Sequence, residues 1–273
     1  NETLQYGELA PFSTDECPNL PANFMPSTYA AEALTLEHAS SPRYHDTYTY
    51  MQDDWRRYLY AYYRLVERAD REVGRIVGVL KARGLYDDSA IIFLSDHGDG
   101  VAAHGWNQKW NLQEEVVNVP LIVKAPEGAG LRGVRNDEAL SNVGLDLYAT
   151  VCDYAGVAPD PERYRGRSLR PVAEGRQTTL HDEVFVETLL PGPGMRGWCV
   201  VGPRYKYVLY QWGRNREALY DLQDDPGEMV NLAVDRRYEA ELNRLRRAMY
   251  DWGVRIGDPK LVRNLRPWAE PRN

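Results

Sequence analysis

Four side chains that are able to bind a metal ion and an anion lie within one short segment, Ser95–Lys109. They are a carboxylate, two imidazoles and an ammonium, contributed by Asp96, His97, His104 and Lys109. Carboxylates are the oxygen ligands that hard cations prefer, and a lysine ammonium offers three donors to a tetrahedral oxyanion. The set therefore suits a divalent cation together with an anionic substrate.

A buried strand is predicted directly ahead of this segment, and it must position the first two of these residues. The run 90–94, Ala-Ile-Ile-Phe-Leu, is apolar throughout, and Gly98 and Gly100 then open the chain into a loop. In parallel α/β sheets, ligands and catalytic groups collect at the carboxyl ends of the strands. We therefore expect Asp96 and His97 at the carboxyl end of this strand.

The neighbouring elements predict an α/β fold. An apolar stripe with three- and four-residue spacing predicts a core-facing helix over 59–83, ending at Gly84. A second strand is predicted over 119–124 and a further helix over 145–155. Strands that alternate with helices favour a mostly parallel sheet sandwiched by helices.

The pattern changes beyond residue 180. Short apolar runs over 184–187, 198–201 and 205–210 are separated by Pro-Gly and Gly-Pro turns, which predicts an antiparallel sheet. A last amphipathic helix is predicted over 235–252. The end of the chain is therefore expected to form a small antiparallel α+β subdomain.

Three parts are predicted along the chain. Residues 1–54 contain prolines that interrupt any periodicity, so we expect an extended, irregular arm. Residues 55–180 are assigned to the α/β part, and residues 181–273 to the antiparallel-sheet-plus-helix subdomain.

The composition and net charge of the chain limit the classes of partner that it can bind. The 273 residues carry a formal net charge of −7, and an acidic chain is a poor general binder of nucleic acid, because neutralising phosphates needs a positive surface. No apolar run approaches the ~20 residues of a membrane span, and no signal peptide is visible. The cysteines, Cys17, Cys152 and Cys199, are too few for a disulfide scaffold, and we expect buried free thiols or at most one bridge.

The order of several motifs resembles the C-terminal half of a sulfatase, in the alkaline phosphatase superfamily. The run from Tyr58 to Lys124 carries SDHGDG, AAHGWNQK, LQEEV and VNVPLIV. The tail YKYVLYQWGRNREALYDLQDDPGEMVNLA resembles the C-terminal subdomain of that family. On this resemblance, residues 55–180 are the C-terminal part of the main sulfatase domain and residues 181–273 are its C-terminal subdomain.

The resemblance implies a role for each residue of the loop. It places Asp96 on a calcium ion, with His97 beside it, either at the metal or hydrogen-bonded to the nucleophile or the sulfate. It assigns Lys109 to the sulfate. His104 would protonate the departing alcohol or bind the sugar, and Trp106 and Asn107 would line the substrate subsite.

Structural alternatives exist for the same residues. Asp96 can cap the loop, with His97 satisfied by backbone, and Lys109 can be a solvated surface lysine. His104 can pack the loop, and Trp106 can serve as ordinary hydrophobic packing.

The resemblance also shows what this sequence lacks. The sulfatase nucleophile is a formylglycine made within a Cys-x-Pro-Ser-Arg motif, and none of the three cysteines lies in that context. In that family the N-terminal half also supplies an Asp-Asp pair to the calcium, and that motif is not found here either. Calcium usually takes six to eight ligands. We therefore expect an N-terminal half of the same enzyme to be the partner that supplies both.

The resulting hypothesis is a calcium-dependent sulfatase that hydrolyses a sulfate ester of a carbohydrate or glycosaminoglycan. The alternatives are a phosphonate or phosphate ester hydrolase of the same superfamily, and a catalytically dead remnant that binds sulfated glycans. The resemblance implies a periplasmic, secreted or lysosomal location.

Overall fold

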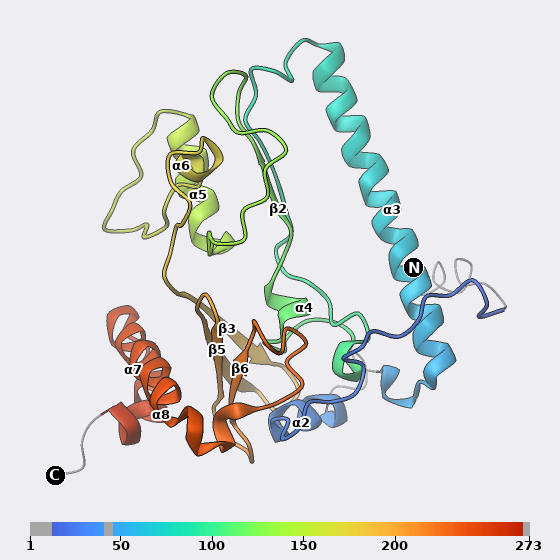
Figure 1. Ribbon diagram of the computed structural model, residues 1–273, viewed down its shortest axis with the longest axis vertical. Coiled ribbons are helices and arrows are strands. Elements are labelled where there is room, and N and C mark those ends of the chain that lie inside the picture. Colours follow the sequence, from blue (N-terminus) through green and yellow to red (C-terminus); the bar gives the residue numbers. More distant parts are fainter. Residues whose placement is uncertain (1–12, 41–45, 270–273) are drawn as a thin grey trace.

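The chain comprises an α/β part followed by an antiparallel subdomain, as Figure 1 shows for the computed structural model, which describes residues 13–40 and 46–269. This arrangement confirms the predicted α/β class and the antiparallel character of the C-terminal part. Residues 1–12 and 41–45 of the predicted arm lie outside the described residues. The predicted domain boundaries stay predictions.

Helix α3 (Gln52–Ala82) leads into the site strand and is buried only near its start. Asp53 and Asp54 lie in its first turn, where carboxylates interact favourably with the helix dipole. Trp55 and Leu59 are buried in the first turns, whereas Ile76 further along is 63% exposed. The prediction of a core-facing helix is therefore wrong for the later turns, because no described element covers that stretch of the apolar stripe.

Strands β1 (Ile91–Leu94) and β2 (Leu121–Lys124) pair antiparallel, with the first residue of each opposite the last residue of the other. This pair differs from the mostly parallel sheet that the alternation of strands and helices favours for the α/β part as a whole. A parallel return needs a crossover connection, usually a helix. The connection 95–120 holds only the turn η2 (Ala103–Gly105) and the short helix α4 (Glu114–Val117), so the chain returns beside the strand that it has just left.

Helices α5 (Val143–Tyr154) and α6 (Arg170–Ala173) complete the α/β part. Asp146 of α5 is fully buried and accepts a hydrogen bond from Nε2 of His181 at 2.9 Å. Because His181 lies just before the C-terminal sheet, this contact fastens α5 to the start of the subdomain.

The C-terminal subdomain is a four-stranded antiparallel sheet in sequence order, comprising β3 (Val184–Leu190), β4 (Met195–Val201), β5 (Tyr205–Tyr210) and β6 (Glu217–Asp221). Helices α7 (Glu239–Ile256) and α8 (Pro259–Ala269) pack on one face of it. Leu245, Met249 and Leu261 are fully buried there against Trp198 and Leu209. Strand β6 and helix α8 were not predicted from the sequence.

The arm covers the other face of the same sheet. Helix α2 (Glu32–Ser40) brings Ala33 against a buried cluster that includes Cys199 and Tyr210. Thr28 forms a parallel bridge with Val230. The irregular arm predicted from the prolines is therefore wrong at 32–40, because packing on the sheet stabilises a helix that has little apolar periodicity of its own.

Three single 3-10 turns complete the described elements, namely η1 (Asp46–Thr49), η3 (Leu232–Val234) and η4 (Arg236–Tyr238). Among the described residues, every helix is too short or too polar to cross a membrane.

Candidate functional site

Asp96, His97 and Lys109 come together immediately after β1. The Lys109 ammonium donates to Nε2 of His97 at 2.9 Å, and the same ring nitrogen lies 3.5 Å from Oδ2 of Asp96. Oδ1 of Asp96 accepts the backbone N–H of His97 at 2.9 Å. The loop therefore gathers three of the four ionisable residues that the sequence singles out.

The hydrogen bonds around His97 indicate which ring nitrogen carries the proton. Nδ1 of His97 lies 2.8 Å from the carbonyl oxygen of Gly98, and a carbonyl can only accept. The proton therefore belongs on Nδ1, which leaves the lone pair of Nε2 for the ammonium of Lys109.

Asp96 is a surface carboxylate that favours its charged form. The hydrogen bond from the His97 backbone lowers the pKa of Asp96, and the positive charge of Lys109 acts in the same direction. Its side chain is 84% exposed, so lone pairs of both oxygens face solvent. Asp96 can therefore serve as a metal ligand or contact a bound cation without first losing a buried partner.

Asp99 organises the backbone of the loop. Its carboxylate accepts the hydroxyl of Tyr58 at 2.7 Å and the backbone N–H groups of Val101 and Gln108. Five non-glycine residues of this loop have positive φ, an uncommon and strained state: Val101, Ala102, His104, Gln108 and Trp110. Such a conformation persists only when its surroundings over-determine it, and Asp99 supplies several of the required contacts.

Trp106 and Asn107 support the loop from inside the protein. Trp106 is 2% exposed, stacks on His38 with ring centroids 4.1 Å apart, and donates from Nε1 to the carbonyl of Lys109. Asn107 is 4% exposed and accepts the hydroxyl of Thr47 at 2.5 Å. These contacts agree with the packing alternative for Trp106, and the substrate-lining roles stay predictions.

Gly98 is required where the loop crosses α4. A Cβ placed on Gly98 would lie 1.9 Å from the carbonyl oxygen of Glu115, and the Gly98 N–H donates to the carbonyl of Val116. Gly98→Ala is expected to destabilise the protein by about 3 kcal/mol, because backbone must move to remove the overlap. Guanidinium unfolding measures this change.

The matched control is Gly74→Ala in the middle of α3, where a Cβ would meet nothing within 4 Å. Alanine is a better helix former, so this variant should be neutral or gain up to about 1 kcal/mol. Equal stabilities for the two variants would contradict the close approach at Gly98.

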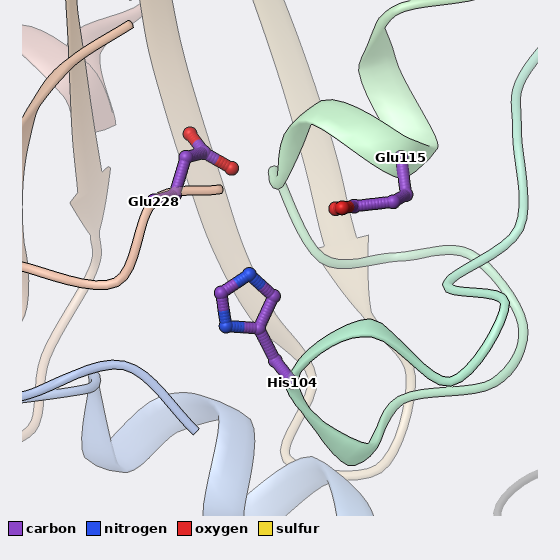
Figure 2. A group of neighbouring side chains, drawn as sticks. All are labelled: His104, Glu115 and Glu228. Atoms are coloured by element: carbon purple, nitrogen blue, oxygen red, sulfur yellow. The ribbon is translucent and has the colours of Figure 1, made fainter. Parts of the chain in front are cut away.

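His104 lies in a second cluster, with Glu115 and Glu228, as Figure 2 shows. One potential ligand atom from each of the three side chains lies within 4.8 Å of the other two. His104 is 7% exposed, and no described contact joins its ring to Lys109. Burial lowers the pKa of His104, and the charge of Glu115 opposes that effect.

Lys206 carries the positive charge beside this cluster. Its ammonium is fully buried and lies 2.9 Å from both Glu114 and Glu228. Burial by itself lowers the pKa of Lys206, but the two carboxylates outweigh it and raise that pKa above its usual value. Burial raises the pKa of Glu228 despite Lys206. The pKa of Lys206 and the pKa of Glu228 can both be raised, because two carboxylates act on the one ammonium while each carboxylate has only a share of its charge.

The sequence reasoning missed Glu228 as a member of this cluster and Lys206 as the cation beside it. Both fall within the quoted tail motif, Lys206 in YKY and Glu228 in DPGEM. The motif identified the subdomain but gave no sign that these side chains turn toward the site loop.

Calcium fits the first cluster only as part of a larger ligand set. Asp96 offers carboxylate oxygens, but the lone pair of Nε2 of His97 already accepts from Lys109. Six to eight oxygen ligands are usual for calcium. Asp96 would therefore be one ligand among several, and the others would come from outside this cluster.

The described cysteines do not offer a nucleophile. Cys17, Cys152 and Cys199 are buried free thiols, as expected from their number. Burial raises the pKa of Cys199 to about 12, so its reactive thiolate is scarce near neutral pH.

Two family profiles each match more than half of the chain. Residues 102–254 match the family described as N-sulphoglucosamine sulphohydrolase, C-terminal, and residues 13–157 match the family described as sulfatase. Together they cover both the site loop and the C-terminal sheet.

Individual proteins agree with these profiles. The chain is 31% identical to a delta 4,5-hexuronate-2-O-sulfatase of Bacteroides thetaiotaomicron, over 97% of this chain and 56% of that protein. A solved structure of a 2-O GAG sulfatase has a TM-score of 0.82 and 30% identity, over 93% of this chain and 56% of the other.

A more distant structure, a phosphonate monoester hydrolase from Silicibacter pomeroyi, has a TM-score of 0.66 and 25% identity, over 90% of this chain and 56% of the other. The chain thus spans about half the length of each of these proteins.

Proposed function

This chain belongs to the sulfatase family, and we propose that it is the C-terminal portion of an enzyme that hydrolyses sulfate esters of carbohydrates. The observation that carries the proposal is the contact among Asp96, His97 and Lys109 at the end of β1. Relatives named as a hexuronate-2-O-sulfatase and an N-acetylglucosamine-6-O-sulfatase support a sulfated sugar, of the glycosaminoglycan kind, as the substrate.

Lys109 is proposed to bind the sulfate. Its side chain is partly buried and its ammonium donates to His97, so the position of the ammonium is fixed before the substrate binds. A preorganised cation stabilises the negative charge that grows on oxygen as the ester bond breaks. His97, protonated on Nδ1 toward Gly98, then acts as the acceptor that holds the lysine in place.

A calcium ion bound at Asp96 would supply further charge for polarising the sulfate. The leaving-group role of His104 stays a prediction, since its ring is buried and faces Glu115 and Glu228. The periplasmic, secreted or lysosomal location also stays a prediction.

We further propose that an N-terminal half of the same enzyme supplies the formylglycine and the remaining calcium ligands. The apolar stripe of α3 and the faces of β1 and β2 support such a partner: Val66, Ile76, Val79, Phe93 and Ile122 are 41% to 63% exposed. A two-stranded sheet is marginal by itself. Additional strands and helices packed on these surfaces would bury them.

The function is tested by Asp96→Asn in the protein that includes this upstream half. Calcium affinity is expected to fall by more than ~100-fold, because removing a direct ligand costs more than the ~10- to 100-fold typical of residues behind the ligands. Calcium titration calorimetry and the release of sulfate from a fluorogenic ester measure the two consequences.

Asp88→Asn is the control, since Asp88 is an exposed carboxylate near the opposite end of β1. It should leave both quantities unchanged. Calcium-dependent turnover that survives Asp96→Asn would refute the proposed site.

The second candidate is a phosphonate monoester hydrolase, which the solved structure of that activity favours. Parallel assays with an aryl sulfate and an aryl phosphonate distinguish the two reactions by their relative kcat/KM. Tight binding of a sulfated glycan without turnover of either ester would instead support the catalytically dead remnant.

A further inference from the structure

Two parts of the connection between β1 and β2 and one segment far away in the sequence converge on one buried point (Figure 2). His104 comes from the turn η2 within the site loop, Glu115 from α4, and Glu228 from the turn after β6. The imidazole points between the two carboxylates. The point therefore lies where the α/β part and the C-terminal subdomain meet.

The imidazole of His104 is buried, and neither Nδ1 nor Nε2 has a hydrogen-bond partner of good geometry among the described residues. The backbone of Gly227 lies near enough to the ring to act as a weak acceptor, which raises the pKa of His104 slightly against the effect of burial. A buried polar group without a partner is unfavourable, so a His104 left this way requires an explanation. The carboxylates of Glu115 and Glu228 are the polar groups that face the ring.

The charges around this point do not balance. Glu114, Glu115 and Glu228 contribute three carboxylates, and Lys206 contributes one ammonium in contact with two of them. Asp225 adds a further negative charge that acts on the ring. A divalent cation would offset the excess negative charge, whereas the burial of His104 disfavours a protonated ring.

We propose that His104, Glu115 and Glu228 bind one divalent transition-metal ion of the zinc class, which fastens the site loop and α4 to the C-terminal subdomain. Imidazole with carboxylates suits zinc, manganese or iron better than calcium. This site is separate from the one proposed at Asp96. A structural role follows from its burial, since Glu228 is 1% exposed.

The contacts behind the carboxylates support this assignment. Asn23 donates to Oε1 of Glu115 at 2.7 Å, which restrains the orientation of that carboxylate. The backbone N–H of Glu114 donates to Oε2 of Glu228 at 2.8 Å. Hydrogen bonds of this kind orient metal-binding side chains.

The cluster must close slightly to bind an ion. Ligand atoms that now lie within 4.8 Å of one another would have to approach about 3.4 Å in a tetrahedral zinc site. Rotation of the two glutamate side chains would have to supply this change. Water would complete the coordination.

The test uses the 273-residue chain, stripped of metal with a chelator and titrated with Zn²⁺ and with Co²⁺. We expect one equivalent to bind, with a visible Co²⁺ spectrum of nitrogen and oxygen ligands and without a thiolate charge-transfer band. His104→Ala and Glu115→Gln should each weaken Zn²⁺ binding by at least a hundredfold. Circular dichroism confirms that each variant is folded.

Glu127→Gln is the matched control, because Glu127 is a surface carboxylate that contacts only Arg132 among its described ion pairs. Its Zn²⁺ affinity should equal that of the unchanged chain. Absence of one-equivalent binding by the folded chain would overturn the proposal. Binding that persists in both folded variants, or a thiolate band from the cysteines, would overturn it as well.

Discussion

Replacing Lys109 by alanine is expected to lower the turnover of a sulfate ester by about a hundredfold in the enzyme that includes the proposed upstream half. Removing one preorganised donor from a developing oxyanion typically costs ~3 kcal/mol of transition-state stabilisation. The free energy of unfolding should change by less than about 1 kcal/mol, because Lys109 is only partly buried and pairs with a neutral imidazole.

Steady-state kinetics with a sulfated monosaccharide, together with guanidinium unfolding, separate the two effects. kcat should fall more than KM rises, since the charge that Lys109 meets grows in the transition state. Lys109→Arg should recover only part of the rate, because a planar guanidinium does not reproduce a compact ammonium.

Lys81→Ala is the matched control, a lysine on the exposed part of α3 that lies over the ring of Tyr86. Its kcat should match that of the unchanged enzyme. A Lys109→Ala enzyme with the rate of this control would exclude Lys109 from the reaction.

The group at the end of β1 could be predicted because its signals are local. An apolar run of strand length ends just before Asp96 and His97, and the glycines that follow permit a tight loop. Lys109 is only twelve residues from His97, so its return to the imidazole needs no long-range contact. The chemistry of these three residue types and their order was sufficient.

The second cluster could not be predicted, because its members depend on tertiary contacts. Glu114 and Glu228 are 114 residues apart, yet the backbone of one donates to the side chain of the other. Neither residue has a periodicity that marks it as buried. His104 was assigned to the substrate on the motif alone, whereas its direction is set by the positive φ of the turn that carries it.

The wrong predictions for helix α3 and for the arm that contains helix α2 have a common physical origin. An apolar stripe indicates that a helix will meet an apolar partner, but it does not say whether that partner lies in the same segment of chain, as α3 illustrates. Conversely, α2 has almost no apolar periodicity and is stabilised by the sheet on which it packs. In both helices, the elements available to pack against them determine which of their residues are buried.

Replacing Lys206 by methionine is expected to destabilise the protein by about 3–5 kcal/mol, because it leaves buried carboxylates without their counter-charge. Lys206 is fully buried, as is Glu228, and the ammonium contacts Glu228 and Glu114 at 2.9 Å. Methionine keeps most of the length and volume of the side chain, so the change reports charge rather than a cavity. Guanidinium unfolding in the presence of a chelator measures it without contribution from a bound ion.

A double variant distinguishes this explanation from a packing defect. In the double variant, Lys206→Met with Glu228→Gln, a neutral amide replaces the more deeply buried carboxylate. The double variant should therefore be at least about 1 kcal/mol more stable than the single methionine variant. Arg247→Ala, which breaks the exposed pair with Asp251, should cost less than about 1 kcal/mol. If the two substitutions at Lys206 and Glu228 simply add their losses, the charge of Glu228 is not what makes Lys206 necessary.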